Sequence, residues 1–215
     1  MIRIRNIHKS YRVHGQSKVI LDGINLDIPA GHKLAVMGRN GAGKSTLIRL
    51  IGRVELPTKG SIEHTMRVSW PLGFSGAFQG SLTGVDNMRF ISRIYQKDIL
   101  ELTRIVDGFA ELGDALYKPV KTYSSGMRAR LAFALSIAID FDCYLIDEVI
   151  LVGDQRFHER CREQLFDRRA GRALVIASHD TGLLTQICDS AIVLSNGLAT
   201  HFNDVSEAAE VYRNL

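Results

Sequence analysis

The chain has 215 residues, of which 46% are hydrophobic and 23% are charged, the composition of a soluble globular protein with a substantial core. Its formal net charge is +4 and its isoelectric point is about 9.0. This mild basic excess suits phosphate-bearing ligands or an anionic membrane surface, although a solvated basic surface would give the same balance. The sequence contains no internal repeat and no low-complexity segment.

No stretch of the sequence approaches the ~20 apolar residues that a membrane-spanning helix needs, since the longest, 131–139, stops at Asp140. The first residues, MIRIRN, lack the apolar region of a secretory signal. The three cysteines, Cys143, Cys161 and Cys188, are widely spaced and fit neither a disulfide framework nor a zinc site. We therefore expect a cytosolic chain in which the cysteines are packing residues.

The first half of the chain begins with strand patterns. Hydrophobic alternation and short apolar runs predict strands over 2–11, 19–28 and 33–38, a helix over 44–51, and short strands near 61–63 and 67–70. The segment GFSGAFQGSLTG then places four glycines in twelve residues. Because glycine is conformationally free, this density predicts a flexible connector over 73–84.

Helical patterns dominate from this connector to about residue 139, after which strands and helices alternate. The predicted elements are strands 143–147, 173–177 and 190–194, separated by helices 154–169 and 181–188 and followed by a helix over 205–213. The last helix is expected to begin at a cap supplied by Asp204 or Ser206. This alternation predicts parallel βαβ units, and thus an α/β core made of both ends of the chain with a helical insertion over about 80–139.

The segment GRNGAGKST, residues 38–46, matches the phosphate-loop pattern between a predicted strand and a predicted helix. Its glycines let the backbone wrap round phosphate groups, and its N–H groups and the helix N-terminus face the anion. Lys44 is expected to reach the β- and γ-phosphates, and Ser45 to offer its hydroxyl to Mg²⁺. The residues predicted to bind the nucleotide here are Gly38, Asn40, Gly41, Ala42, Gly43, Lys44, Ser45 and Thr46.

Two further apolar strands end in polar residues that suit nucleotide hydrolysis. CYLIDE ends in Asp147, placed to hold a second Mg²⁺ contact, and Glu148, placed to orient or deprotonate the attacking water. VIASHD delivers His179 to the same sheet edge, where it would sense the γ-phosphate. An ordinary strand end is the alternative for the carboxylates, and a structural role is the alternative for the histidine.

These residues, together with YSSGM at 123–127, resemble the nucleotide-binding subunit of ABC transporters over nearly the whole chain and in the family's order. The resemblance implies one domain over 1–215, with N-terminal antiparallel strands, a P-loop NTPase core over 1–79 and 140–215, and an inserted helical subdomain over 80–139. It also implies that Tyr11 stacks on adenine and that Gln79 belongs to the loop that links core and helices and contacts Mg²⁺. Alternatively, Tyr11 is an ordinary aromatic residue of a strand and Gln79 is an exposed loop glutamine.

The family's signature is usually Leu-Ser-Gly-Gly-Gln, and this chain has Tyr123-Ser124-Ser125-Gly126-Met127 in its place. The resemblance implies that Ser124 and Gly126 face the phosphates of an ATP held by a second copy of the chain. It also places Asp154 in a loop that touches that second copy. The middle glycine and the terminal glutamine are replaced, while the serine and the final glycine that face phosphate are retained, and with them the anion-binding chemistry of the turn.

YSSGM, DEVILVGD and the short connector look like the bacterial polysaccharide-export branch, and most like its capsular-polysaccharide subunits. This resemblance implies an ATPase that works as a head-to-tail dimer with a membrane permease, on the cytoplasmic face of the inner membrane. ATP and Mg²⁺ are the implied cofactors, with no nucleic acid and no direct polysaccharide contact. Some O-antigen exporters of this branch carry an appended carbohydrate-binding domain, which is not expected in this chain.

Three alternatives stay open at this point. The chain could export another polymer, such as O-antigen or teichoic acid, or it could be a soluble P-loop switch or DNA-repair ATPase without a permease. The absence of heptads and of a long coiled-coil insertion in the sequence argues against the repair ATPase. A non-catalytic binding module is the third, and the intact Lys44, Asp147, Glu148 and His179 argue against it.

Overall fold

The computed structural model describes residues 1–13, 15–72, 78–148 and 155–215. Contacts among the Cα atoms divide the chain into two compact units. The first contains Met1–Pro71, Asp142–Glu148 and Ala170–Leu215, and the second contains Leu72–Phe141 and Val149–Arg169. The segment 149–169, which the sequence analysis assigned to the α/β core, is thus grouped with the helices.

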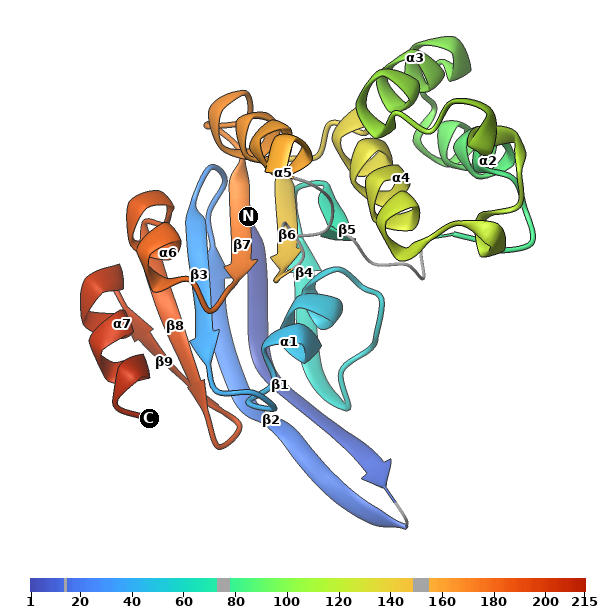
Figure 1. The fold of residues 1–215 in the computed structure, drawn as a ribbon. Helices are drawn as coiled ribbons and strands as arrows, with labels where there is room; N and C mark the ends of the chain where they lie inside the picture. The colour runs from blue at the N-terminus through green and yellow to red at the C-terminus, as the bar shows by residue number, and fades with distance from the viewer. Residues whose placement is uncertain (14, 73–77, 149–154) are drawn as a thin grey trace. The chain divides into compact units, whose positions relative to one another are not determined.

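The first unit is built around a six-stranded sheet with the order β5-β6-β7-β3-β8-β9 (Figure 1). Its strands are β3 (Lys33–Gly38), β5 (Val68–Leu72), β6 (Cys143–Asp147), β7 (Ala173–Ala177), β8 (Ser190–Ser195) and β9 (Leu198–Phe202). The neighbouring pairs β6/β7, β7/β3 and β3/β8 are parallel, as the alternation of strands and helices predicts. The antiparallel strand β9 was not predicted, because a two-residue turn at Asn196 and Gly197, both with positive φ, folds it directly back on β8.

The N-terminal strands form a second, antiparallel sheet with the order β2-β1-β4. It consists of β1 (Ile2–Val13), β2 (Gln16–Ile28) and β4 (Lys59–His64). Both β1/β2 and β1/β4 pair antiparallel, which confirms the predicted antiparallel N-terminal strands. Gly60 permits the close approach of β4 to β1, since it has a φ of 88° and a Cβ there would lie 2.2 Å from the Asn6 carbonyl oxygen.

The main core of the first unit lies between the two sheets and around α1 (Lys44–Ile51). Alternate residues of β3, β6, β7 and β8 contribute to it, together with the inward side chains of β1 and β2 and the apolar face of α1. Two more helices, α6 (Thr181–Ile187) and α7 (Val205–Arg213), follow β7 and β9, and α7 packs on β3, β8 and β9. Asp204 caps α7 by accepting a hydrogen bond from the Ser206 backbone N–H, so the first of the two predicted caps is correct.

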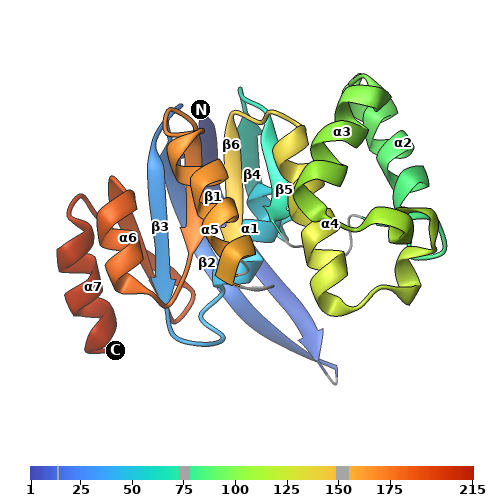
Figure 2. The ribbon, with the colours of Figure 1, turned by 45° about the horizontal axis from the view of Figure 1, so that its top comes forward.

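The second unit is helical (Figure 2). It contains α2 (Gly84–Tyr95), α3 (Ile99–Ala110), α4 (Ser125–Ala138) and α5 (Gln155–Arg162), with 3₁₀ turns at Gly113–Tyr117 and Val120–Thr122 and a π-helical turn at Glu163–Asp167. The predicted helix 154–169 is therefore two elements, and its first residue lies outside the described residues. In the described parts of the chain, no helix is long and apolar enough to cross a membrane.

Candidate functional site

The phosphate loop connects the end of β3 to the start of α1, as the motif requires. Gly38 and Gly43 have φ angles of 152° and 106°, a region that favours glycine. A Cβ on Gly38 would lie 2.6 Å from the Leu194 carbonyl oxygen, and one on Gly43 would lie 2.9 Å from a Leu21 methyl carbon. The N-terminus of α1 has no side-chain cap and no acidic residue in its first turn, so its N–H groups remain open to an anion.

Lys44 lies inside this loop and is 6% exposed. Its Nζ donates to the Gly38 carbonyl oxygen at 2.8 Å and lies 3.8 Å from Glu148 Oε1. A buried ammonium group needs such acceptors, and phosphate oxygens would provide stronger ones. The loop therefore holds a cation at the place where the motif predicts phosphates.

Ser45 and Asp147 come together at the base of the loop. The Ser45 hydroxyl donates to Asp147 Oδ1 at 2.9 Å. Burial raises the pKa of the Asp147 carboxyl above its usual value, the hydrogen bond from Ser45 opposes this, and the charge of Glu148 adds to it. A carboxylate and a hydroxyl are the oxygen ligands that Mg²⁺ prefers, so this pair fits a divalent cation bound with nucleotide phosphates.

Glu148 directly follows β6 and has a φ of 55°, which is uncommon for a residue with a side chain. Its backbone N–H donates to the Ala177 carbonyl oxygen at 3.0 Å, which holds the residue in this conformation. Its carboxylate lies 2.8 Å from His179 Nε2. Because β6, β7 and β3 are adjacent and parallel, their ends bring Glu148, His179 and the phosphate loop to one sheet edge.

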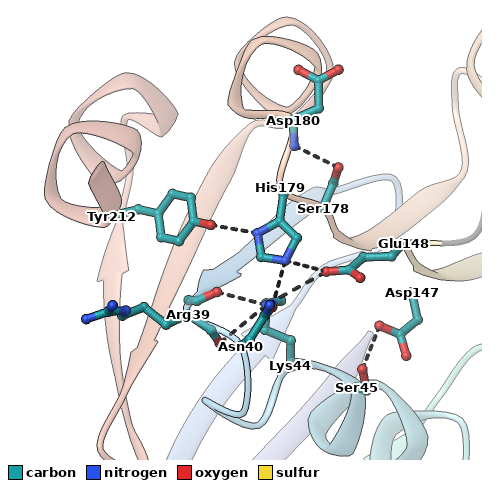
Figure 3. Close-up of polar contacts among 11 residues, drawn as sticks. Arg39, Asn40, Lys44, Ser45, Asp147, Glu148, Ser178, His179, Asp180 and Tyr212 are labelled. Atoms are coloured by element: carbon teal, nitrogen blue, oxygen red, sulfur yellow. Dashed lines mark hydrogen bonds and ion pairs between the residues drawn. The ribbon is translucent and has the colours of Figure 1, made fainter. Parts of the chain in front are cut away.

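His179 is the centre of the polar contacts at this edge (Figure 3). Its Nε2 lies 3.0 Å from Asn40 Oδ1 as well as 2.8 Å from Glu148 Oε1. Its Nδ1 lies 2.6 Å from the hydroxyl of Tyr212, a residue of α7. No sequence signal singles out Tyr212, because one tyrosine on an amphipathic helix is ordinarily a packing residue.

A pocket of about 280 Å³ opens over the phosphate loop. It is lined by Lys18, Ile20, Asn40, Gly41, Gly43, Lys44, Ser45, Thr46 and Glu148. All of these except Lys18 and Ile20 were predicted from the sequence, and β2 brings those two to the loop from an earlier part of the chain. The pocket thus gathers a cation, hydroxyl groups and a carboxylate, as phosphate binding and hydrolysis require.

Tyr11 lies on β1 opposite Lys18, outside the residues that line this pocket. Its hydroxyl donates to Glu55 Oε2 at 2.5 Å, and the Lys9 ammonium lies 4.9 Å from its ring centroid. Arg49 also binds Glu55, with 2.7 Å between Nε and Oε1. The predicted stacking of Tyr11 on adenine stays a prediction.

The predicted site residues Gln79, Ser124 and Gly126 belong to the second unit. The Gln79 backbone N–H donates to Asn87 Oδ1 at 3.0 Å, and residues 80 and 82 bond through their carbonyl oxygens to the N–H groups of 121 and 120. The described part of the connector is therefore a hydrogen-bonded turn, while 73–77 lie outside the described residues. Asp154 also lies outside them.

Ser124 is exposed at the N-terminus of α4, where its Oγ accepts a hydrogen bond from the Met127 N–H at 3.2 Å. The first turn of α4 contains no acidic residue, and Gly126 leaves the approach to it open. Tyr123, by contrast, is buried, and its hydroxyl donates to the Ala115 carbonyl oxygen at 2.5 Å. The unusual tyrosine of the signature thus has a packing role beside the exposed serine.

A glycine-rich loop after a buried parallel strand, with an Asp-Glu pair at the same sheet edge, defines a P-loop nucleotide-binding protein. The family model described as ABC transporter matches residues 21–150. The ATP-binding protein BexA of Haemophilus influenzae is 55% identical over 99% of this chain and 98% of its own length. These two findings show that the chain belongs to the ABC transporter family.

Two more relatives match over nearly their full lengths. The capsule polysaccharide export ATP-binding protein CtrD of Neisseria meningitidis serogroup B is 53% identical over 100% of both chains. The polysialic acid transport ATP-binding protein KpsT of Escherichia coli is 43% identical over 99% of this chain and 96% of its own. Such levels of identity exceed what a shared fold alone would produce.

A solved ATP-binding cassette, in a dimeric post-hydrolysis state bound to ADP and Pi, has a TM-score of 0.79 to this structure at 20% identity. The match covers 95% of this chain and 99% of the cassette. This likeness confirms the predicted fold class, a P-loop core with N-terminal antiparallel strands and an inserted helical subdomain.

Proposed function

We propose that the chain is the ATPase subunit that powers export of a capsular polysaccharide, working as a head-to-tail dimer with a membrane permease at the cytoplasmic face of the inner membrane. The observation that carries the ATPase part is that Lys44 and Glu148 line the pocket over the phosphate loop, with His179 Nε2 2.8 Å from the Glu148 carboxylate. The similarity to CtrD, a capsule polysaccharide export protein, and to KpsT, a polysialic acid transport protein, supports the polysaccharide part.

In the proposed reaction, Lys44 exchanges its contacts with the loop carbonyl groups and Glu148 for the β- and γ-phosphate oxygens of ATP. Ser45 and Asp147 would hold Mg²⁺ beside the phosphates, and Gln79 is a further proposed ligand. When bound, the cation neutralises the charge that develops on the phosphate oxygens. Burial raises the pKa of Asp147, and the charge of a bound cation would oppose this shift because it favours the ionised carboxylate.

Glu148 is the proposed base for the water that attacks the γ-phosphate. The carboxylate accepts the proton of this water while the bond between the β–γ bridging oxygen and the γ-phosphorus breaks, giving ADP and phosphate. His179 contacts Glu148 through Nε2 and is therefore placed to donate to a γ-phosphate oxygen that enters the same space. The pocket on one copy is open, so a second surface is needed to exclude water from the reacting groups.

Ser124 and Gly126 of a second copy are the proposed second surface. The Ser124 hydroxyl and the N–H groups of the first turn of α4 that Ser124 does not cap supply hydrogen-bond donors suited to a γ-phosphate. The backbone bonds between residues 80–82 and 120–121 connect the Gln79 turn to the segment that leads into Ser124. We propose that the helical subdomain, predicted over 80–139, closes and opens as one piece during the cycle, with Asp154 touching the second copy.

The test is the replacement Lys44→Ala in the cell that carries the protein. We expect the polysaccharide to disappear from the cell surface and accumulate inside, because loss of the ammonium removes phosphate binding while the fold is retained. Immunostaining of intact and permeabilised cells measures both pools. If a different polymer, O-antigen or teichoic acid, accumulates inside the Lys44→Ala cells, that polymer is the substrate. If the wild-type protein purifies from the membrane without any integral membrane protein, it is an ATPase that works alone.

A further inference from the structure

We propose that Tyr212 is a positioning residue for ATP hydrolysis, which holds the His179 ring so that its Nε2–H faces the nucleotide pocket. This inference rests on the proposed function, because it assigns a second residue to the γ-phosphate contact of His179. The hydroxyl of Tyr212 lies 2.6 Å from His179 Nδ1, on the side of the ring away from Glu148 and Asn40 (Figure 3).

The partners of the ring determine which nitrogen carries the proton. Nε2 lies 3.0 Å from the amide oxygen of Asn40 and 2.8 Å from a carboxylate oxygen of Glu148, and both oxygens can only accept. Nε2 must therefore carry hydrogen. In the neutral imidazole Nδ1 is then an acceptor, and the Tyr212 hydroxyl, which can donate, is its complement.

The helix α7 places this hydroxyl with little freedom. Val205, Ala208 and Ala209 are buried, and Tyr212 follows them at the i+3, i+4 and i+7 spacing of one helix face. The tyrosine is consequently on the side of α7 that packs on β3, β8 and β9. Its ring lies beside that of His179, with 6.2 Å between the centroids.

A second contact connects the segment that follows α7 to the phosphate loop. Arg39, which follows Gly38, donates from Nη1 to the Leu215 carbonyl oxygen at 3.0 Å. Tyr212 of α7 thus contacts the histidine, and Leu215, two residues after the helix, contacts the loop. Because the His179 side chain is 42% exposed, packing alone does not fix its ring, and the hydroxyl of Tyr212 supplies the missing restraint. When ATP displaces Glu148 from Nε2, this restraint keeps the proton pointing at the phosphate.

The experiment compares wild type with Tyr212→Phe in the purified full-length protein. We expect kcat for MgATP to fall about five- to tenfold, as for loss of one positioning hydrogen bond, with KM within about twofold of wild type. Proton–nitrogen correlation spectra of ¹⁵N-histidine-labelled protein, assigned with His179→Gln, should show Nε2 protonated in wild type. In Tyr212→Phe the His179 Nδ1 resonance should move.

The matched control is Ser206→Ala, which removes a hydroxyl from the same helix away from His179 and should change neither kcat nor the His179 resonances. Protonated Nδ1 in wild type would overturn the proposal, as would a Tyr212→Phe protein with wild-type kcat and spectrum. If that variant does not fold, the wild-type spectrum still decides between the two tautomers. A wild type without ATPase activity would instead refute the proposed function, since the spectra do not depend on turnover.

Discussion

Glu148→Gln is expected to lower ATP turnover by about 10²–10³-fold while ATP binding is retained, the effect of removing a general base. Glutamine keeps an acceptor oxygen for the Nε2–H of His179, 2.8 Å away, so the geometry of the ring survives. It cannot take the proton of the attacking water. Because ATP bridges the two proposed copies, the variant should accumulate as an ATP-bound dimer, visible by size-exclusion chromatography with light scattering.

Glu210→Gln is the matched control, since it makes the same chemical change at an exposed position of α7. It should hydrolyse ATP like wild type and release its dimer after turnover. Unchanged phosphate release by Glu148→Gln would remove Glu148 from the mechanism. A variant that binds no ATP would show instead that the carboxylate is needed for the shape of the pocket.

Ser124→Asp is expected to reduce hydrolysis at least about a hundredfold while each isolated copy still binds ATP. Aspartate caps a helix as well as serine does, so the hydrogen bond to the Met127 N–H and the start of α4 should be kept. It also places a negative charge where the γ-phosphate of the second copy's ATP is proposed to lie. Equilibrium binding of a fluorescent ATP analogue and steady-state phosphate release separate the two effects.

Ser124→Asn is the control for this charge, because asparagine also caps the helix and is nearly isosteric with aspartate. It should retain several times more activity than Ser124→Asp, with an equal melting temperature. Equal activity of the two variants at the wild-type level would mean that no phosphate approaches Ser124. The shared site would then be wrong, although the pocket of the first unit would stand.

Most of the fold was predictable because strands and helices of the α/β core follow plain hydrophobic periodicity. β9 was not predicted because Leu198–Phe202 show little apolar alternation and every residue of the strand is at least partly exposed. Its pairing also depends on the turn at Asn196-Gly197. The division of the predicted helix 154–169 escaped because a π-helical turn depends on local packing and has no periodic signature. Periodicity thus reports which residues are buried and says less about where one element stops.

The candidate site was predictable where a motif encodes backbone chemistry, as in the glycines and Lys44 of the phosphate loop. It was not predictable where a side chain reaches the site from a distant element. Lys18 reaches the pocket from β2, and Tyr212 reaches His179 across 33 residues of chain. The positive φ of Glu148 is also invisible in the sequence, because it follows from the hydrogen bond to β7.

The central claim is that each ATP lies between the phosphate loop of one copy and Ser124 of another, and disulfide trapping tests it most directly. Mixing Asn40→Cys protein with Ser124→Cys protein, both carrying Glu148→Gln, offers one thiol on each side of the proposed interface. The native cysteines should not compete, because burial raises the pKa of Cys143, Cys161 and Cys188 to about 12. Under mild oxidation, we predict a covalent dimer that contains one copy of each variant and forms only with ATP; no such product, or equal amounts without ATP, would contradict the shared site.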